Sequence, residues 1–179
     1  MTIRPAALSD AAQLADIYAY YVENYPYSFE YTAPSAEDFA GRIEAARGAF
    51  PFFVCEEGDE LLGFAYAHPY KERKAVQWIV ETTIYVRYGC EHRGIGTLLY
   101  GQLLPALKSQ GFTQALAILG CPNEGSEAFH EAMGFSLLAT FPDQGYKFGR
   151  WHDVKFYALD LNPAVDNMVE PLPWPIDES

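Results

Sequence analysis

The hydrophobic positions in the N-terminal part of the chain repeat first at helical spacing and then at strand spacing. In "TIRPAALSDAAQLADIYAYYVE" a short strand is followed by apolar residues at helical intervals, with Ser9 or Asp10 as the expected N-cap. The aromatic stretch "NYPYSFEYTAP" contains Pro26 and Pro34 and predicts a loop that lines a pocket or covers the core. A second helix is expected in "SAEDFAGRIEAAR", where Ser35 is placed to cap it.

The next segments carry strand patterns and then alternate between helix and strand. The runs "PFFVCEEGDELLGFAYAHPY" and "AVQWIVETTIYVRY" are rich in β-branched and aromatic residues, and a turn at Gly58 and Asp59 divides the first, which gives three antiparallel strands. A helix from Gly94 to Gln110, the strand "TQALAILG", the helix "NEGSEAFHEAM" and the strands "FSLLATFP" and "HDVKFYALDL" follow. This order predicts an α/β (α+β) fold with a mixed sheet and helices on both faces.

Length and composition predict one domain followed by a short tail. A chain of 179 residues that is 50% hydrophobic can fill one core and is short for two. We expect a domain over residues 1–162 and a proline-rich tail over residues 163–179. In the tail, "NPAVDNMVEPLPWPIDES", Trp174 could pin the chain to the body or to a second subunit, although partial disorder fits this composition better.

Charge and cysteine content argue against several classes of protein. Twelve Lys and Arg residues stand against 24 Asp and Glu residues, and the net charge of −12 repels nucleic-acid phosphates and anionic lipids. Cys55, Cys90 and Cys121 lack the spacing of a metal site, and no long apolar run or leader-like segment opens the chain. We therefore expect a cytoplasmic protein with reduced thiols that binds no metal, no nucleic acid and no membrane.

The stretch "EHRGIGTLLYGQLL" places two glycines at the start of a helix. Gly94 and Gly96 remove side chains where the first N–H groups of a helix are unpaired and its dipole is positive, so a phosphate can approach the backbone. A Walker loop would need Gly-Lys-Ser or Gly-Lys-Thr at its end. A dinucleotide fingerprint would need a third glycine where Leu99 stands. A glycine-capped helix without a ligand is the structural alternative.

This stretch resembles the pyrophosphate loop of the GNAT acyltransferases, whose pattern is Gln/Arg-x-x-Gly-x-Gly/Ala and falls here on Glu91 to Gly96. Glu91 departs from the pattern, because a carboxylate beside a pyrophosphate is unfavourable unless it points away, and Arg93 is expected to keep the loop cationic. The chain also resembles one branch of this family, the phosphinothricin acetyltransferases and related L-amino-acid N-acyltransferases. The resemblance lies in three successive blocks that occur in the same order as in that branch: "WIVETTIYVRYGCEHRGIGTLLYGQLL", "LGCPNEGSEAFHEAMGF" and "GYKFGRWHDVKF".

The resemblance implies acetyl-CoA (coenzyme A) as the cofactor, in a cleft of a splayed sheet between strands that end near Val86 and near Leu119. The cofactor-binding residues that it implies are Ile84, Tyr85 and Val86 through their backbone, Arg93, Gly94, Ile95, Gly96 and Thr97 around the pyrophosphate, and Asn123 and Ser126. Judged from the local sequence pattern alone, Ile84, Tyr85 and Val86 belong to a buried strand, and Asn123 is a helix N-cap. Both interpretations can hold, since main-chain binding leaves side chains free to pack.

The implied chemistry needs mainly a base, because an amine must lose a proton to form an amide with the acetyl group. Glu81 stands at the start of "ETTIYV" beside Ile79 and Val80, so a raised pKa is expected for it, and it is the preferred base. His130, which shares a helix face with Ser126, is the second catalytic candidate, as a proton donor to the leaving thiolate. A solvated or hydrogen-bonded helical histidine is the structural alternative.

Substrate-binding residues are implied by the same resemblance. They are Arg73 as the carboxylate ligand, with Lys71 second, together with Phe29, Glu30 and Thr83. In "GYKFGRWHD", Tyr146, Lys147 and Trp151 could close the pocket, within the chain or across a dimer interface. These residues could equally belong to solvated loops or to packing.

Together these implications predict an N-acetyltransferase that acts on the α-amino group of a small amino acid or analogue, of the phosphinothricin or methionine sulfoximine type, by direct transfer from acetyl-CoA. A homodimer is expected, because members of the family commonly pair. Two alternatives stay open. The same scaffold could acetylate another amine, such as a polyamine, an aminoglycoside or a protein N-terminus, or the chain could be a non-catalytic acyl-CoA-binding module.

Overall fold

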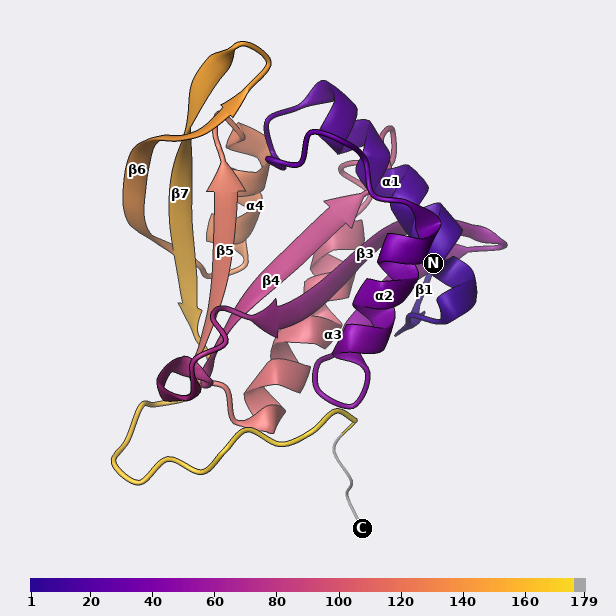
Figure 1. Ribbon diagram of the computed structural model, residues 1–179. Coiled ribbons are helices and arrows are strands. Elements are labelled where there is room, and N and C mark those ends of the chain that lie inside the picture. Colours follow the sequence, from indigo (N-terminus) through magenta and orange to yellow (C-terminus); the bar gives the residue numbers. More distant parts are fainter. Residues whose placement is uncertain (176–179) are drawn as a thin grey trace.

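The computed structural model describes residues 1–175, and a seven-stranded sheet forms its centre (Figure 1). The strands are β1 (Thr2–Pro5), β2 (Phe52–Glu57), β3 (Glu60–Pro69), β4 (Ile79–Val86), β5 (Gln114–Gly120), β6 (Ser136–Lys147) and β7 (Arg150–Asp160). They lie in the order β1-β2-β3-β4-β5-β7-β6, and every neighbouring pair is antiparallel except β4 with β5. The predicted mixed sheet is therefore confirmed.

Helices cover both faces of this sheet, as the sequence predicts. They are α1 (Ala11–Asn24), α2 (Ala36–Ala46), α3 (Ile95–Gln110) and α4 (Glu124–Ala132). Alternate strand residues point to opposite faces, so Phe52 and Val54 pack in one apolar cluster with α1 and α2, whereas Phe53 and Cys55 pack in another with α3. Figure 1 shows α2 in front of the sheet and α3 behind it.

Local side chains set the ends of these helices. Ser35 accepts a hydrogen bond from the Asp38 N–H at 3.2 Å, and the Asp38 carboxylate accepts one from the Ser35 N–H at 2.8 Å, which completes a capping box before α2. Asp10 precedes α1 without capping it through its side chain, because its carboxylate pairs with Arg4 at 2.7 Å. The chain leaves α3 at Gly111, whose φ of 93° suits glycine.

The parallel pair of the sheet opens soon after it begins. β4 and β5 pair only over Ile79–Glu81 and Gln114–Leu116. Beyond this point β4 stays paired with β3 up to Val86, and β5 stays paired with β7 up to Gly120, so the two strands diverge (Figure 1). Their facing main-chain groups then have no strand partner. The predicted splayed pair, with strands ending near Val86 and Leu119, is confirmed.

The last hairpin is longer than the sequence predicts. The pattern "FSLLATFP" predicts a strand that ends at Pro142, but β6 continues opposite β7 to Lys147. Proline is tolerated there because β6 is the edge strand and its register is irregular between Phe141 and Gly145. The block "GYKFGRW" therefore lies in the hairpin.

Residues 163–175 of the tail lie along the body of the protein. The Trp174 ring packs edge-on against the Phe53 ring with centroids 5.9 Å apart, and the backbone N–H of Trp174 donates to the Gly48 carbonyl at 3.2 Å. The Trp78 indole donates to the Val169 carbonyl at 2.7 Å. These contacts attach residues 163–175 to the body of the protein, where partial disorder was expected. Residues 176–179 lie outside the described part of the chain.

Replacing Trp174 by alanine is expected to lower the free energy of unfolding by about 1–2 kcal/mol, because a partly buried aromatic contact with Phe53 is lost. Urea denaturation measures the change. Val165, which is exposed in the same tail, offers the control: Val165→Ala should stay within about 0.5 kcal/mol of the parent. Equal effects of the two substitutions would contradict anchoring by Trp174.

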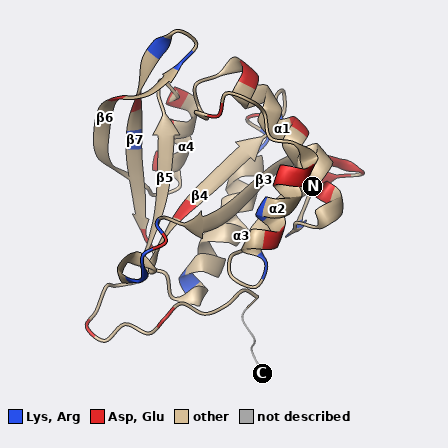
Figure 2. Ribbon diagram, viewed as in Figure 1, with Lys and Arg blue, Asp and Glu red and all other residues tan. Residues whose placement is uncertain are grey.

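Acidic side chains are spread over much of the described surface. Figure 2 shows Asp and Glu on α1 and α2, with Lys and Arg few and scattered. Within residues 1–175, no helix combines the length and the hydrophobicity needed to cross a membrane. In the same part of the chain, no three His, Cys, Asp or Glu side chains gather in a way that would hold a metal ion.

Candidate active site

A cavity of about 880 Å³ lies where β4 and β5 diverge. Its walls come from β4, the end of β5, the starts of α3 and α4, and the end of α1 with the segment that follows it. Most residues singled out from the sequence line this cleft: Glu30, Glu81, Thr83, Ile84, Tyr85, Val86, Gly94, Ile95, Gly96, Thr97, Asn123, Ser126 and His130. The other seven are not among its lining residues: Phe29, Lys71, Arg73, Arg93, Tyr146, Lys147 and Trp151.

The two glycines before α3 have different structural reasons. Gly94 adopts a φ of +78°, a left-handed conformation that glycine tolerates best, and a Cβ there would meet no atom within 4 Å. Gly96 lies against α4, where a Cβ would come within 2.9 Å of the Phe129 ring. The first N–H groups of α3, as in any helix, have no intrahelical acceptor. No side chain caps them at Gly94, so they border the cleft without a partner from a capping residue. This turn can hold an anion such as pyrophosphate.

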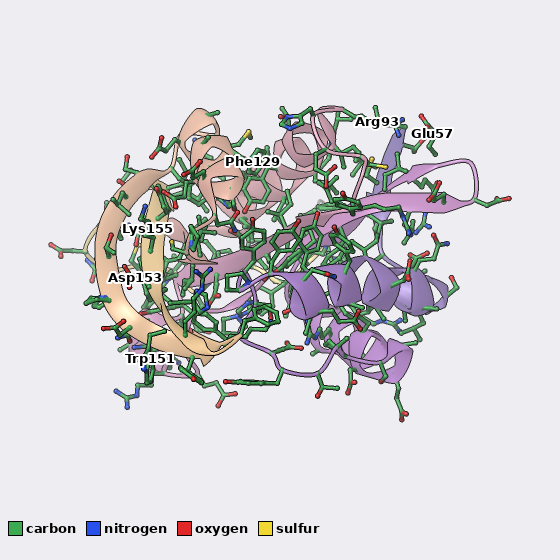
Figure 3. The ribbon with its side chains drawn as sticks, turned by 90° about the horizontal axis from the view of Figure 1, so that it is seen from above. Glu57, Arg93, Phe129, Trp151, Asp153 and Lys155 are labelled. Carbon is green, nitrogen blue, oxygen red and sulfur yellow. The ribbon has the colours of Figure 1, made fainter. Side chains whose placement is uncertain are left out.

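The charged side chains beside this turn have partners of their own. Arg93 donates to the Glu57 carboxylate at 2.8 Å, and Figure 3 shows the two together at the edge of the molecule, apart from Phe129. The structure therefore does not show Arg93 as the cation of the loop. The Glu91 carboxylate accepts a hydrogen bond from the Gly89 N–H at 2.8 Å. An anion at the start of α3 would thus meet backbone N–H groups and the positive end of the helix dipole.

Asn123 and Ser126 form the start of α4. The Asn123 side chain accepts a hydrogen bond from the Ser126 N–H at 3.4 Å, so it caps the helix as the local pattern predicts. Both residues also line the cleft. The structural and the functional interpretation of Asn123 are therefore compatible.

Tyrosines of α1, of the segment that follows it and of the turn after β4 form one wall of the cleft. The segment after α1 was expected to line a pocket or to cover the core, whereas Tyr18, Tyr21 and Tyr88 were not assigned to the site. The tyrosines that line the cleft here are Tyr18, Tyr21, Tyr25, Tyr27 and Tyr88. The Tyr21 hydroxyl donates to the Val86 carbonyl at 2.6 Å, so that carbonyl already has a partner, and Tyr25 and Tyr27 stack with ring centroids 4.7 Å apart. For Tyr25 and Tyr27 the signal in the sequence is the aromatic density of "NYPYSFEY". Tyr18, Tyr21 and Tyr88 lie outside that stretch.

His130 is buried in a chain of hydrogen bonds, with 1% of the residue exposed. Its Nδ1 lies 2.7 Å from the Ser126 carbonyl, which can only accept, so Nδ1 carries the proton. Nε2 then accepts from the Tyr100 hydroxyl at 3.0 Å, and Tyr100 lies 3.0 Å from the Thr82 hydroxyl where the sheet opens. Burial lowers the pKa of His130, and its hydrogen bond to Ser126 opposes this in part, so the ring is neutral near pH 7.

This geometry bears on the catalytic role expected for His130. A neutral ring whose Nε2 accepts a hydrogen bond has no proton on that atom to give to a thiolate, and its Nδ1–H is bonded to the backbone of its own helix. His130 is better placed to hold α4 against α3 and β4 through Tyr100 and Thr82 than to transfer a proton.

The buried His130 predicts a dependence of stability on pH. Because its pKa is lower in the folded protein than the ordinary value of about 6.5, its contribution is complete above that value and is lost as the pH falls through the folded-state pKa. His130→Leu should flatten this dependence and cost about 1–3 kcal/mol near neutral pH, since the Ser126 carbonyl and the Tyr100 hydroxyl lose a partner.

Denaturation curves at about pH 7.5 and about pH 5.5 measure both effects. The exposed His92 provides the control, and His92→Asn should keep the parent's pH dependence. If His130→Leu and the parent lose stability equally on acidification, the assignment of this dependence to His130 is wrong.

Glu81 is the last residue of β4 that pairs with β5, and its side chain is 25% exposed. Burial raises the pKa of its carboxyl, and His68, whose Nε2 lies 4.0 Å from Oε1, lowers it in part. His68 lines the cleft as the cross-strand neighbour of Glu81 on β3, a pairing that the sequence does not show. A carboxylate with a raised pKa beside an open cleft can accept a proton from an amine.

The end of the cleft near α1 and α2, here called the acceptor end, contains an ion pair. Arg42 donates to the Glu30 carboxylate at 2.8 Å, and its guanidinium lies 4.7 Å from the Phe39 ring centroid. Among residues 1–175, Arg42 is the only Lys or Arg that lines the cleft. Lys71 and Arg73 are exposed in the connection between β3 and β4. The sequence-based choice of Arg73 therefore has no support from its place in this chain.

Comparison with known proteins gives one consistent assignment. A family model described as an acetyltransferase (GNAT) domain matches residues 3–155. The phosphinothricin N-acetyltransferase of Streptomyces viridochromogenes is 36% identical over 171 residues, which cover 95% of this chain and 93% of that protein. An L-methionine sulfoximine/L-methionine sulfone acetyltransferase of Pseudomonas paraeruginosa is 29% identical over 91% of this chain and 96% of its own length. The crystal structure of a phosphinothricin acetyltransferase from Sinorhizobium meliloti in complex with AcCoA superposes with a TM-score of 0.86 at 30% identity, over 93% of this chain and 94% of that one. The resemblance noted in the sequence is thus confirmed, and the chain belongs to the GNAT acetyltransferase family.

Proposed function

We propose that this GNAT acetyltransferase transfers the acetyl group of acetyl-CoA to the α-amino group of a small amino acid or analogue of the phosphinothricin or methionine sulfoximine type. The observation that carries the proposal is the juxtaposition in one cleft of an uncapped first helical turn, an unpaired strand edge and a partly buried carboxylate. Each corresponds to one requirement of the reaction: an anion site, an extended binding edge and a base.

The residues present fit the two ends of acetyl-CoA. The N–H groups at the start of α3, from Ile95 to Thr97, suit its pyrophosphate. The edge of β4 beyond Glu81 has no strand partner toward β5. Successive residues of a strand point their main-chain groups to opposite sides, and the main chain of Tyr85 faces β3, so Ile84 and the N–H of Val86 are the groups that can exchange hydrogen bonds with the amide-containing pantetheine arm. When bound, acetyl-CoA supplies the activated acetyl thioester.

Glu81 is the group that moves the proton in this proposal. Its carboxylate accepts a proton from the acceptor amine, directly or through water, as a C–N bond forms to the thioester carbonyl carbon. The C–S bond breaks and CoA leaves as the thiolate, so no oxidant or further reactant is needed. Burial raises the pKa of Cys121 to about 11, which leaves that thiol protonated and supports transfer without an acyl-cysteine intermediate.

The test is release of CoA thiol from acetyl-CoA in the presence of a panel of amines. L-amino acids, phosphinothricin and methionine sulfoximine form one arm, and polyamines and an aminoglycoside form the other. Turnover confined to the first arm is the expected result. Turnover confined to polyamines would replace the proposed acceptor, and the carboxylates Glu30, Glu81 and Glu91 in the cleft make this the second candidate. Binding of acetyl-CoA without release on any amine would favour a non-catalytic acyl-CoA-binding module.

We also propose that two chains pair through the β6–β7 hairpin and that the protein works in the cytoplasm. Large apolar side chains are exposed on this hairpin, namely Leu137, Leu138, Phe141, Tyr146, Phe148 and Trp151. Figure 3 shows Trp151 at the periphery of the molecule. The three cysteines are free, which fits a reducing compartment. Light scattering should give twice the mass of one chain, and the mass of a single chain would contradict pairing.

A further inference from the structure

The segment that follows α1 connects the two halves of the opened sheet. Residues 25–31, here called the latch segment, leave α1 and reach β5 and β6, where they contact Gly120 and Gly145. Tyr25, Tyr27 and Ser28 of the latch segment line the cleft. Whatever holds this segment in place therefore also shapes the acceptor end.

A buried lysine of the β6–β7 hairpin is bonded to the latch segment. Lys147 is 3% exposed, and its ammonium donates to the carbonyls of Val22 at 2.7 Å, Tyr25 at 3.1 Å and Ser28 at 2.7 Å. An ammonium has three donors, so these three carbonyls satisfy it completely. Val22 lies in the last turn of α1, where carbonyls lack helical partners and the helix dipole favours a cation.

The main chain at Lys147 belongs to the β5 half of the sheet. The ring of His152, 3% exposed, lies between two carbonyls, with Nε2 2.9 Å from the Lys147 oxygen and Nδ1 3.2 Å from the Cys121 oxygen. Cys121 directly follows β5. The lysine thus reaches from the β5 half of the sheet to acceptors that belong to α1 and the latch segment.

Phe29 gives the latch segment a second contact with the same half. A Cβ at Gly145 would overlap the Phe29 ring, and a Cβ at Gly120 would overlap the Pro26 carbonyl and lie 3.4 Å from the ring. Two glycines therefore make the room in which this segment packs. This packing explains why Phe29, expected among the substrate-binding residues, is absent from the cleft wall.

We propose that Lys147 is a positioning residue for the acceptor: by holding three carbonyls at the end of α1 and in the latch segment, it sets the width of the acceptor end. The inference rests on the proposed function, because it assigns the latch segment to the acceptor and leaves acetyl-CoA to α3 and α4. Lys147 acts within one chain and without touching the substrate. Burial lowers the pKa of Lys147, and the charge of Glu30 opposes this in part.

Lys147→Met tests the inference, since it keeps the length of the side chain and removes all three donors. The Michaelis constant KM for the acceptor should rise about tenfold or more, while Kd for acetyl-CoA changes less than about twofold. Amide hydrogen exchange should speed up in residues 25–31 and stay unchanged in α3. Arg150→Met, which removes an exposed charge from the same hairpin, is the matched control and should leave all three quantities unchanged.

Gly145→Ala disturbs the latch segment through its second contact, the packing of Phe29 against Gly145. If Lys147→Met fails to fold, this variant tests whether the latch segment positions the acceptor. It should displace Phe29 and reproduce the rise in acceptor KM with acetyl-CoA binding kept. Unchanged exchange in residues 25–31 in both variants would overturn the anchoring. Faster exchange with an unchanged acceptor KM would overturn the positioning role. If no amine releases CoA thiol even from the parent, the proposed function fails, and the exchange measurement alone judges whether Lys147 holds the segment.

Discussion

Replacing Glu81 by glutamine is expected to lower kcat by about a hundredfold or more, while acetyl-CoA binds as in the parent. The amide keeps the shape of the side chain at the point where β4 and β5 separate but cannot accept the proton of the amine. Steady-state kinetics with the best acceptor of the panel and calorimetric titration with acetyl-CoA measure the two quantities. An unchanged kcat at every pH would remove Glu81 from the role of base.

The pH dependence of the parent adds a signature that a structural defect would not produce. Because burial raises the pKa of Glu81, activity should fall on acidification at a pH above the ordinary glutamate value of about 4.3. The positive charge of His68 lowers that pKa, so His68→Gln should move the acid limb to higher pH. In Glu81→Gln this limb should vanish. An acid limb that stays in place in both variants would assign it to another group.

Replacing Gly96 by alanine is expected to weaken acetyl-CoA binding about tenfold and to lower the free energy of unfolding by about 1–3 kcal/mol. The added methyl group would come within 2.9 Å of the Phe129 ring and push α4 away from α3, which are the two helices that border the cofactor part of the cleft. Calorimetric titration with acetyl-CoA and urea denaturation measure the two effects.

Gly101 provides the matched control for this substitution. It lies in the same helix with nothing within 4 Å of a Cβ, so Gly101→Ala should bind acetyl-CoA normally and be slightly more stable. In the double variant with Phe129→Leu, the smaller side chain should restore most of the stability lost in Gly96→Ala. If it restores none, the overlap with Phe129 is not the cause.

The order of elements could be predicted from the sequence because each carries its own period and its own end signals. Ser35 before α2 and Gly111 after α3 are local signals, and both are confirmed. The end of β6 was placed wrongly because Pro142 usually stops a strand, and only its position at the edge of the sheet makes it tolerable. The opening between β4 and β5 was expected from the family resemblance and not from any residue pattern.

The residues that line the cleft could be predicted where they belong to one continuous motif. The direction and hydrogen bonds of a side chain could not be predicted where a partner far away in the chain decides them. The motif around Gly94 and Gly96 does line the cleft. The direction of the Arg93 side chain depends on Glu57, which lies 36 residues away in the chain. His130 lies in the predicted helix, yet its hydrogen bond with Tyr100, 30 residues away, changes what its ring can do. No periodicity records such pairs.

The backbone character of the anion site has a consequence for how this protein responds to salt. A cofactor with several phosphate charges approaches a chain of net charge −12 whose cleft offers only Arg42 as a lysine or arginine within residues 1–175. Dissolved ions screen the long-range repulsion between the two, whereas short hydrogen bonds to helix N–H groups are screened far less. We therefore expect a higher ionic strength to favour the encounter, and we expect acetyl-CoA binding not to require the dilute conditions that cation-rich phosphate sites need.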